Sequence, residues 1–419
     1  NAGMKKSISV FWKFTPFWLF LLFFKFGAGL HFSLASPLGE SLLPLWAVGL
    51  LIGSGAFVQL VLDVPAGHLM DRYGYRRLLI ITTATFAIAT TCLFFGLTRT
   101  TYILTILIAT FGWLFFGPGE GAYTLVHAPK EQTGKFISFR DVSAAIGTMF
   151  AGAAVPFGLM LSPQHLGYTL FTLMGLALVC IWFSPRDKHS VHKKIKIATQ
   201  AHYVRRHSIF NAWRMIKKLN PASSTLLLLN VSASIFYGSV WFVVPLVISH
   251  RHEAGALALG LSIFDLAIVL LGFVIGNMAD KFNKRWLVFI GLLIFSLSGL
   301  MLGFNFDILF LFFGFMATAG HELAGLSLWS WLYTLDKNHA HDGAVAGVLN
   351  LALDLGWTIG PIAAGFLYTF VGPSWTIAYC AIPLVLVWGL YSFMLHRHQP
   401  LQALPGIVPA LPRRLRHKN

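Results

Sequence analysis

Two short charged segments, each set between strongly apolar stretches, repeat 209 positions apart in this chain. They span residues 67–77 and 276–286. The same offset relates two further pairs of glycines, Gly134 with Gly343 and Gly147 with Gly356. A register that survives several loops indicates that one half of the chain repeats the other. The sequence therefore predicts a duplicated bundle with a polar turn at the same place in each copy.

The composition places this bundle in a membrane. Of the 419 residues, 56% are hydrophobic and 11% are charged, and the mean hydropathy is +0.71. So few charges cannot cover a soluble globule of this size. The three cysteines all lie in apolar stretches without paired spacing, which predicts neither a disulfide frame nor a metal site. We expect no cofactor.

Twelve apolar stretches approach the length of about 20 residues that a helix needs to cross a bilayer. They lie near 14–36, 42–66, 78–97, 101–126, 136–160, 166–184, 222–248, 256–279, 286–305, 308–334, 344–370 and 374–396. Twelve crossings put both termini on one side, and 27 of the 31 Lys and Arg residues then lie on that side. The positive-inside rule predicts cytoplasmic termini in an inner (plasma) membrane. The net charge of +16 then reflects topology and an anionic inner leaflet, not nucleic acid.

The predicted organisation is two six-helix bundles and two polar segments. The bundles span residues 4–184 and 222–396, a basic cytoplasmic linker spans 185–221, and a basic, proline-rich tail that we expect to be disordered spans 397–419. Within the linker, residues 204–219 have the spacing of an amphipathic helix, and a solvated basic loop is the alternative. A cleaved signal peptide is the alternative for the first apolar stretch, but Lys25 interrupts that stretch and the charge asymmetry requires it as a crossing.

The charged turns resemble a motif of the major facilitator superfamily, which lies between the second and third helices and recurs in the second half. The matching residues are Gly67, Asp71, Arg72, Gly74 and Arg76 in the first copy and Gly276, Asp280, Lys281 and Lys284 in the second. The resemblance covers the whole chain through twelve helices, the basic linker and both motif copies. It implies an all-α membrane fold of two pseudo-symmetric six-helix bundles that work by alternating access, and it does not identify a substrate.

In the family this turn holds the cytoplasmic side shut, and the spacing in this chain agrees with that role. Asp63, Gly67 and Asp71 are four residues apart and share one helix face. Gly67 is expected to permit close approach of the eleventh helix (344–370), whose positive N-terminal end would meet Asp71. The basic residues of the turn would pair with Asp63 and Glu120. The alternative is that these basic residues only enforce topology.

Two positions depart from the family motif. Tyr75 stands where the family has its second arginine, so Arg76 or Arg77 would have to take the pairing role. In the second copy Asn283 replaces the turn glycine, and asparagine tolerates left-handed backbone.

Ionisable residues at bilayer depth cost roughly 2.5–3.5 kcal/mol each on insertion scales and are candidates for function. Four lie near the middle of their stretches, the depth at which transporters bind substrates and ions: Lys25, Asp265, Glu322 and Asp354. We predict that they form the substrate and proton-coupling site, because a carboxylate can take up and release a proton as its surroundings change. A structural ion pair, for example Lys25 with Glu322, is the alternative.

Three further charges lie about two turns from the cytoplasmic face. Glu120, Arg140 and Asp141, with Asp63, are predicted to form a gate or charge network. Arg140 and Asp141 are adjacent on a helix and point about 100° apart, so at most one of them is expected to face the cavity.

A glycine-proline run in the eleventh helix, residues 356–365, resembles a motif that antiporters of the superfamily carry on the fifth helix. Because it lies on a different helix here, close packing is the favoured interpretation. Aromatic residues on the presumed cavity helices, among them Tyr237 and Trp241, could contact a ring-bearing solute. His31 and His321 could take part in proton transfer, although a hydrogen-bonded core role is the simpler interpretation.

Together these features predict a monomeric secondary transporter, not an enzyme, whose partners are a small organic solute, protons and lipid. Proton-coupled efflux of an amphipathic compound is the leading hypothesis. Proton-linked uptake of a metabolite or metal chelate is its rival. A carboxylate-bearing cargo would use Lys25 and Arg140 as anchors, and a cationic one would use Asp265, Glu322 and Asp354. A membrane-embedded enzyme is disfavoured because no catalytic motif is present, and a channel because there is no filter-like loop.

Overall fold

The computed structural model of this chain describes residues 12–128, 133–187, 221–250, 259–304, 307–335 and 342–398. Within these ranges the secondary structure is helical throughout, as predicted, and contains no strand. Residues 188–220 and 399–419 lie outside the described residues, and so does the surface helix predicted at 204–219.

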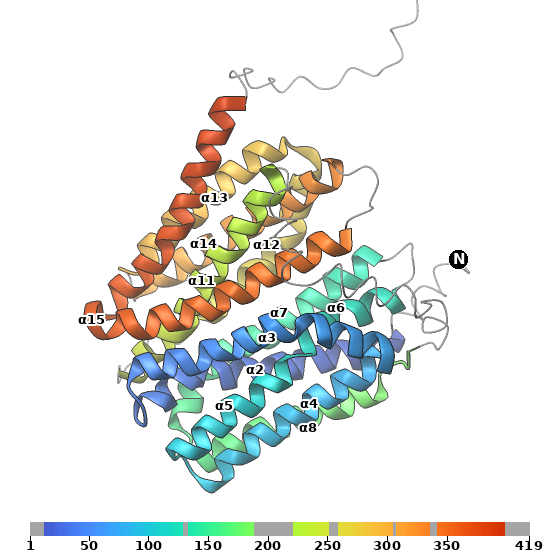
Figure 1. Cartoon of the computed structure of the whole chain (residues 1–419), viewed down its shortest axis with the longest axis vertical. Helices are drawn as coiled ribbons and strands as arrows, with labels where there is room; N and C mark the ends of the chain where they lie inside the picture. Colours follow the sequence, from blue (N-terminus) through green and yellow to red (C-terminus); the bar gives the residue numbers. More distant parts are fainter. Residues whose placement is uncertain are drawn as a thin grey trace, which may run out of the picture.

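The first group of helices, which we call the N-half, fills the lower part of Figure 1. Its elements are α2 (Thr15–Glu40), α3 (Leu45–Tyr73), α4 (Tyr75–Thr91), η1 (Cys92–Phe95), α5 (Arg99–Trp113), α6 (Phe116–His127), α7 (Thr133–Met160) and α8 (Pro163–Phe183). The η1 turn continues α4 to the end of one apolar span. The α5–α6 pair is also one span, interrupted just before Pro118, since proline lacks an N–H and disfavours helical backbone in the residue before it.

The second group, the C-half, fills the upper part of Figure 1. Its elements are α11 (Pro221–His250), α12 (Ser262–Lys281), α13 (Lys284–Leu302), α14 (Ile308–Leu335) and α15 (Asp342–His398). The helix α15 contains two predicted crossings, because its backbone breaks at Gly372, where φ is +73° and Pro373 follows. Figure 1 shows this break as the sharp reversal of the orange ribbon.

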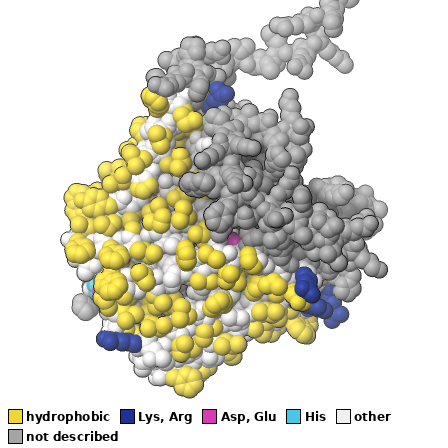
Figure 2. Space-filling view, viewed as in Figure 1, with side chains coloured by type: hydrophobic (Ala, Val, Ile, Leu, Met, Phe, Trp, Pro, Cys, Tyr) yellow, Lys and Arg dark blue, Asp and Glu magenta, His cyan; other side chains and the backbone are white. Residues whose placement is uncertain are grey.

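Ten apolar spans within the described residues are long enough to cross a membrane. The number is smaller than the twelve predicted for two reasons. The last span, Leu351–Met394, contains both arms of α15, and α12 contains only a shorter apolar stretch, Ser262–Gly272. Figure 2 shows hydrophobic side chains over most of the described part of one face, with Lys and Arg near its margins, as expected for a surface in contact with lipid.

The internal repeat reappears in the packing of the two halves. A Cβ atom added at Gly147 on α7 would lie 2.5 Å from the carbonyl oxygen of Leu22 and 2.9 Å from Cβ of Lys25 on α2. A Cβ added at Gly356, 209 positions later, would lie 2.5 Å from the carbonyl oxygen of Val231 and 2.5 Å from Cβ of Ser234 on α11. Leu22 and Lys25 are themselves 209 positions before Val231 and Ser234. The same helix crossing is therefore built twice at equivalent positions.

The described contacts between the halves are concentrated at one end of the helices, where α2 leads into α3. There the hydroxyl of Ser36 donates to the carbonyl of Phe242 at 2.7 Å, and the hydroxyl of Ser262 donates to the carbonyl of Met149 at 2.7 Å. At the same end Glu40 Oε2 lies 2.9 Å from His250 Nε2. We call the other end, where α3 meets α4 and α12 meets α13, the motif end.

The helices α3 and α15 cross with glycines facing backbone. A Cβ at Gly49 would lie 3.2 Å from Cα of Gly365, and one at Gly53 would lie 2.6 Å from the carbonyl oxygen of Thr358. The glycine-proline run of α15 therefore serves close packing, as favoured from the sequence. The prediction that Gly67 permits close approach of the eleventh helix stays a prediction. No described atom lies within 4 Å of a Cβ added at Gly67, and the side chains of residues 342–350, at the start of that helix, lie outside the described residues.

The two motif turns use different backbone devices. Gly74, between α3 and α4, has φ +95°, a region that favours glycine. Asn283, its counterpart between α12 and α13, has φ −66° and ψ 109°, so the left-handed backbone predicted there is wrong. Its side chain instead accepts a hydrogen bond from the backbone N–H of Arg285 at 3.1 Å and caps α13.

Candidate substrate and proton site

A cavity of about 430 Å³ lies between the two halves. All four residues predicted for the substrate and proton-coupling site line it: Lys25 from α2, Asp265 from α12, Glu322 from α14 and Asp354 from α15. The remaining polar lining consists of His31, Gln59, Thr110, Thr148, Tyr237, Thr318 and His321, and the aromatic lining of Phe32, Trp113, Trp241, Phe264 and Trp357. The charges that the sequence scatters over four helices thus converge on one space.

Lys25 lies against aromatic rings and not against a carboxylate. Its Nζ is 4.7 Å from the ring centroid of Phe116 and 5.1 Å from that of Trp113, within the range of cation–π attraction. The break between α5 and α6 positions both rings, because Trp113 ends one helix and Phe116 begins the next. The alternative of a Lys25–Glu322 ion pair is not seen among the described residues.

Asp265 is held across the interface between the halves. Its carboxyl group hydrogen-bonds with Thr148 on α7, and it lies within electrostatic reach of Lys25. Its Oδ2 atom is buried and has no hydrogen-bond partner among the described residues. An unpartnered carboxylate oxygen in a cavity is available to a ligand or a proton.

Glu322 occupies a different wall, beside a histidine and a tyrosine. Its Oε1 lies 3.8 Å from Nδ1 of His321. The ring of His321 stands almost perpendicular to that of Tyr237, at 5.5 Å between centroids. Both predicted histidines, His31 and His321, line the cavity.

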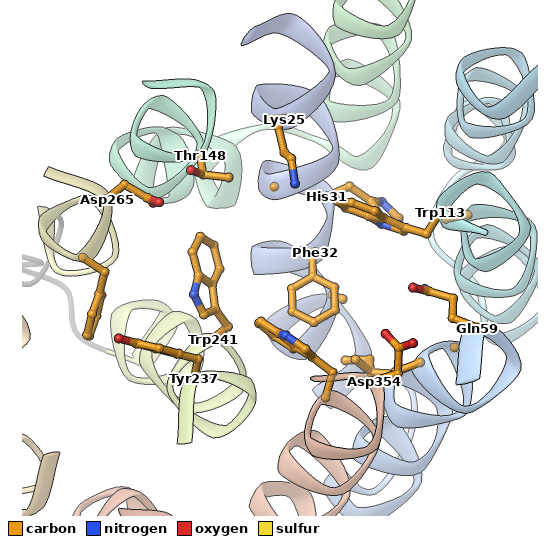
Figure 3. A pocket seen from close by; sticks show the side chains of 18 of the residues that line it. Lys25, His31, Phe32, Gln59, Trp113, Thr148, Tyr237, Trp241, Asp265 and Asp354 are labelled. Carbon is orange, nitrogen blue, oxygen red and sulfur yellow. The ribbon is translucent and has the colours of Figure 1, made fainter. Parts of the chain in front are cut away.

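Asp354 pairs with a residue that the sequence assigned to the gate. Its carboxyl group shares a hydrogen bond with that of Asp63 on α3. A deprotonated carboxylate only accepts hydrogen bonds, so two carboxyl groups can share one only when one of them holds a proton. Figure 3 shows Asp354 beside Gln59 on one side of the pocket and Asp265 beside Thr148 on the other, with Phe32 and Trp241 between them.

The remaining gate residues do not line the cavity. Arg140 and Asp141 pair with each other, with Arg140 Nε donating to Asp141 Oδ1 at 2.8 Å. Neither of them lines the cavity, which agrees with the expectation that at most one of the two would face it. The guanidinium packs against α6, where a Cβ added at Gly121 would lie 3.3 Å from it. Glu120 is buried within electrostatic reach of Lys25, Arg140 and Asp141, so these residues form a charge cluster behind the Lys25 wall.

The arginines of the first motif turn bind elsewhere than predicted. Arg76 donates from Nε to the carbonyl of Ile181 at 3.2 Å and from its terminal nitrogen to the carbonyl of Trp182, and so caps the C-terminal end of α8. Its backbone N–H donates to Asp187 Oδ2 at 3.1 Å. The guanidinium of Arg72 lies over the ring of Tyr73. Neither Asp63 nor Glu120 is among these described partners.

The structure assigns no role in the cavity to several residues of the two motif copies. The side chains of Asp71 and Asp280 lie outside the described residues, so the predicted contact of Asp71 with the start of the eleventh helix does too. Gly276 has no described atom within 4 Å of an added Cβ, and Lys281 is exposed. Lys284 begins α13.

The sequence analysis did not predict most of the uncharged residues that line the cavity. The 209-residue offset between the halves would have helped to predict them. Seven pairs of register partners line the cavity together: Phe32 with Trp241, Gly55 with Phe264, Ala56 with Asp265, Gln59 with Ile268, Ala109 with Thr318, Trp113 with Glu322, and Thr148 with Trp357. Two of the four charged residues that the sequence placed in the cavity, Asp265 and Glu322, have uncharged register partners that line it too.

A duplicated helical bundle with a charged cavity between its halves is the architecture of a secondary membrane transporter. The family model of the Major Facilitator Superfamily matches residues 8–360 and 226–417. The chain belongs to that family, as its motif suggested, and is a transporter and not an enzyme. An uncharacterised MFS-type transporter from Methanocaldococcus jannaschii is 22% identical over 353 residues, which are 83% of this chain and 88% of that protein.

Solved transporters share the fold at low sequence identity. A bacterial homologue of the human lysosomal transporter Spinster, inward-facing and unoccupied, has a TM-score of 0.69 and 14% identity, covering 94% of this chain and 99% of that one. The xylose transporter XylE from E. coli, partially occluded and inward open, has a TM-score of 0.67 and 16% identity, covering 93% and 100%. The nucleoside transporter NupG has a TM-score of 0.66 and 16% identity, covering 91% and 98%.

Proposed function

We propose that this chain is a proton-coupled transporter that exports a small amphipathic organic cation across the inner membrane. The observation that carries the proposal is the composition of the cavity. Three carboxyl groups and one ammonium group face a space walled by aromatic rings. Its volume of about 430 Å³ is that of a pocket for a small organic molecule.

The charge balance of the cavity favours a cationic cargo. Asp265 and Glu322 stand on the C-half with little direct pairing, whereas Lys25 is already placed over Trp113 and Phe116. A cation would meet carboxylates for its charge and aromatic faces for its rings and methyl groups. A carboxylate-bearing metabolite or metal chelate, taken up with protons, is the second candidate, because Lys25 has no ion-pair partner among the described residues.

Proton coupling follows from where the carboxyl groups lie. The halves of the bundle contact each other at one end of the helices and diverge at the other. Alternating access would therefore move these carboxyl groups between surroundings filled with water and surroundings that exclude it. A carboxyl group that changes surroundings in this way changes its affinity for protons. An inward-directed proton gradient would then drive a cation outward by exchange.

The proposed setting in the cell rests on charge topology. We place both termini and the basic linker in the cytoplasm, the motif end on the same side, and the basic residues near an anionic inner leaflet. On this assignment the structure opens toward the cytoplasm. We propose that the working unit is a monomer, since each chain contains both halves of the cavity.

A pH dye trapped in proteoliposomes tests the proposal and identifies the cargo class in the same measurement. Organic cations with aromatic rings and ring-bearing carboxylates are added outside in turn. An exchanged cation should make the interior more alkaline, because protons leave as it enters, whereas a co-transported solute should make it more acidic. The sign is independent of how the protein is oriented in the vesicle. An Asp307→Asn variant, altered at an exposed residue outside the cavity, is the matched control.

If no solute of either class moves protons while Asp307→Asn and the unmodified chain are both well folded, the proposal of proton coupling fails. If only carboxylates move protons, the second candidate replaces the first.

A further inference from the structure

Asp63 and Asp354 are carboxyl groups from different halves of the molecule that contact each other. Asp63 lies on α3 in the N-half, and Asp354 lies on α15 in the C-half and lines the cavity. Their shared hydrogen bond joins two helices that also cross where glycines face backbone. The second oxygen of Asp354 is buried and has no hydrogen-bond partner among the described residues.

The pair lies at the point where the two helices separate. Toward one end, Gly49 and Gly53 pack against the backbone of α15. Toward the motif end, Gly67 has no described neighbour within 4 Å of an added Cβ. Asp63 is one turn before Gly67, so the pair lies between the close crossing at Gly49 and Gly53 and the position of Gly67.

Elementary chemistry allows this contact only when at least one of the two carboxyl groups is protonated. One proton between two carboxyl groups makes a hydrogen bond, and removing it leaves two negative charges at contact distance in surroundings of low dielectric constant. We propose that Asp63 and Asp354 form a proton-binding site, separate from the cargo-binding carboxylates, whose bound proton holds α3 and α15 together in the arrangement seen here. This inference rests on the proposed function, because it assigns the coupling proton to one pair.

No cation among the described residues compensates the charge of the pair. Within the described residues, Asp63 and Asp354 are each the other's strongest charged neighbour. The other charged or titratable residues of the cavity wall are Lys25 and His31 on α2, Tyr237 on α11, Asp265 on α12, and His321 and Glu322 on α14. Charged or titratable residues on the remaining helices packed against α3 and α15 are Tyr75, Arg76 and Arg77 on α4, Arg99 and Tyr102 on α5, Glu120, Tyr123 and His127 on α6, and Lys284 and Arg285 on α13.

The Asp63–Asp354 pair is separate from the carboxyl groups that are proposed to bind the cargo. Asp354 stands with Gln59 at one side, and Asp265 stands with Thr148 at the other (Figure 3). A cation bound at Asp265 would therefore act on the proton of the pair through movement of the halves and not by direct contact. The step itself is simple: the O–H bond of one carboxyl group breaks, and the proton passes to water in the cavity.

Distances between spin labels test the pair without any cargo. Cys92, Cys180 and Cys380 are first replaced by alanine, and labels are placed at Ser41→Cys and Ser249→Cys, two exposed positions on opposite halves at the end away from the motif turns. A second pair, Tyr73→Cys and Phe282→Cys, reports the motif end. As the pH rises, we expect the population with a short Ser41–Ser249 distance to fall by about tenfold, a small part of the effect that two facing carboxylates can exert.

Variants that cannot lose the proton should abolish this response. Asp63→Asn and Asp354→Asn both preserve a hydrogen bond between the side chains, so each should keep the short distance at high pH. The double variant should do no more than either single one, because both remove the same repulsion. Asp307→Asn, with one carboxylate fewer outside the cavity, should respond to pH as the unmodified chain does. A response that survives in Asp63→Asn or Asp354→Asn overturns the proposal.

Infrared spectroscopy supplies a direct view of the proton. The carbonyl stretch of a protonated carboxyl group should disappear as the pH rises, and the same component should be missing from both single variants. Loss of different components in the two variants would show that they do not share one proton, and would also overturn the proposal. If protons still move with solute in proteoliposomes of Asp63→Asn, the proposed function stands and only the assignment to this pair fails.

Discussion

The N-half and the C-half share a packing scheme but differ in the chemistry of the cavity wall. The helix crossings recur at equivalent glycines, Gly147 and Gly356, with their contacts on α2 and α11 in register. The four charged residues of the cavity have uncharged partners at the equivalent positions: Lys25 with Ser234, Asp265 with Ala56, Glu322 with Trp113, and Asp354 with Ala145. The N-half therefore contributes one cation to the wall, and the C-half contributes three carboxyl groups.

This difference shows which features the two halves share after the duplication, the helix contacts, and which have diverged, the side chains of the cavity. Backbone contacts cannot change without moving a whole helix, so glycine is retained where two helices touch. A side chain that faces an open cavity meets no such constraint and is free to diverge. The shared helix packing thus supports two halves that can rock against each other. The side chains that differ between the halves give the cavity a positive side and a negative side.

The largest effect should come from breaking the shared packing. Gly147→Leu and Gly356→Leu would each push a side chain into a backbone carbonyl, and overpacking of this kind costs about 3 kcal/mol. We expect both variants to lower the Tm of the purified protein by similar amounts, because the two crossings are equivalent. The measurement is thermal unfolding followed by tryptophan fluorescence in detergent.

Gly175→Leu is the control for this comparison. Gly175 lies on α8 with no described atom within 4 Å of an added Cβ, so the larger side chain should be accommodated. A Tm lowered in Gly147→Leu but unchanged in Gly356→Leu would show that the two halves are not packed equivalently.

The next effect should come from the charges that distinguish the two walls. If the cargo is a cation, Asp265→Asn or Glu322→Gln should weaken its binding by about tenfold or more, as expected for loss of one partner of a buried charge pair. Lys25→Met should instead tighten binding, because it removes a like charge from the same cavity. Binding of a solute found in the proteoliposome screen, measured calorimetrically for each variant, checks both signs. The opposite pair of signs would indicate an anionic cargo.

The sequence predicted the fold and the main charged residues because both leave strong signals. Apolar stretches of bilayer length predict helices, and an ionisable residue within such a stretch is costly unless it faces a polar space. Lys25, Asp265, Glu322 and Asp354 lie on four helices, and the structure brings all of them to one cavity. Their depth in the membrane was sufficient to select them.

The partners of these residues could not be predicted, because they depend on how the halves are placed. Asp63 was assigned to a gate with the motif arginines, but its partner is Asp354, more than 290 positions away in the chain. Arg76 was expected to pair with an acid, but it caps α8. Spacing along one helix fixes which residues share a face, and it does not say which face of another helix they meet.

A smaller effect should come from the two hydroxyl groups that join the halves away from the motif end. Ser36 donates from the N-half to the C-half, and Ser262 donates from the C-half to the N-half. Each hydrogen bond contributes about 1 kcal/mol, so Ser36→Ala or Ser262→Ala should shift the ratio of the two open states by about fivefold toward opening at this end. The spin-label distance between positions 41 and 249 measures the shift. Ser33→Ala, which removes a hydrogen bond within α2 alone, should leave the ratio unchanged.

The smallest effect should come from Asn283→Gly, and its contrast with Gly74→Ala distinguishes the two motif turns, which reverse the chain by different means. Gly74→Ala places a side chain on backbone at φ +95°, which costs about 1–3 kcal/mol. Asn283→Gly removes only a cap and should cost a few tenths of a kcal/mol. Thermal unfolding should therefore show a clear loss of Tm for the first variant and almost none for the second. Equal losses would mean that Asn283 does more than cap α13, and the two turns would then be less different than their backbones suggest.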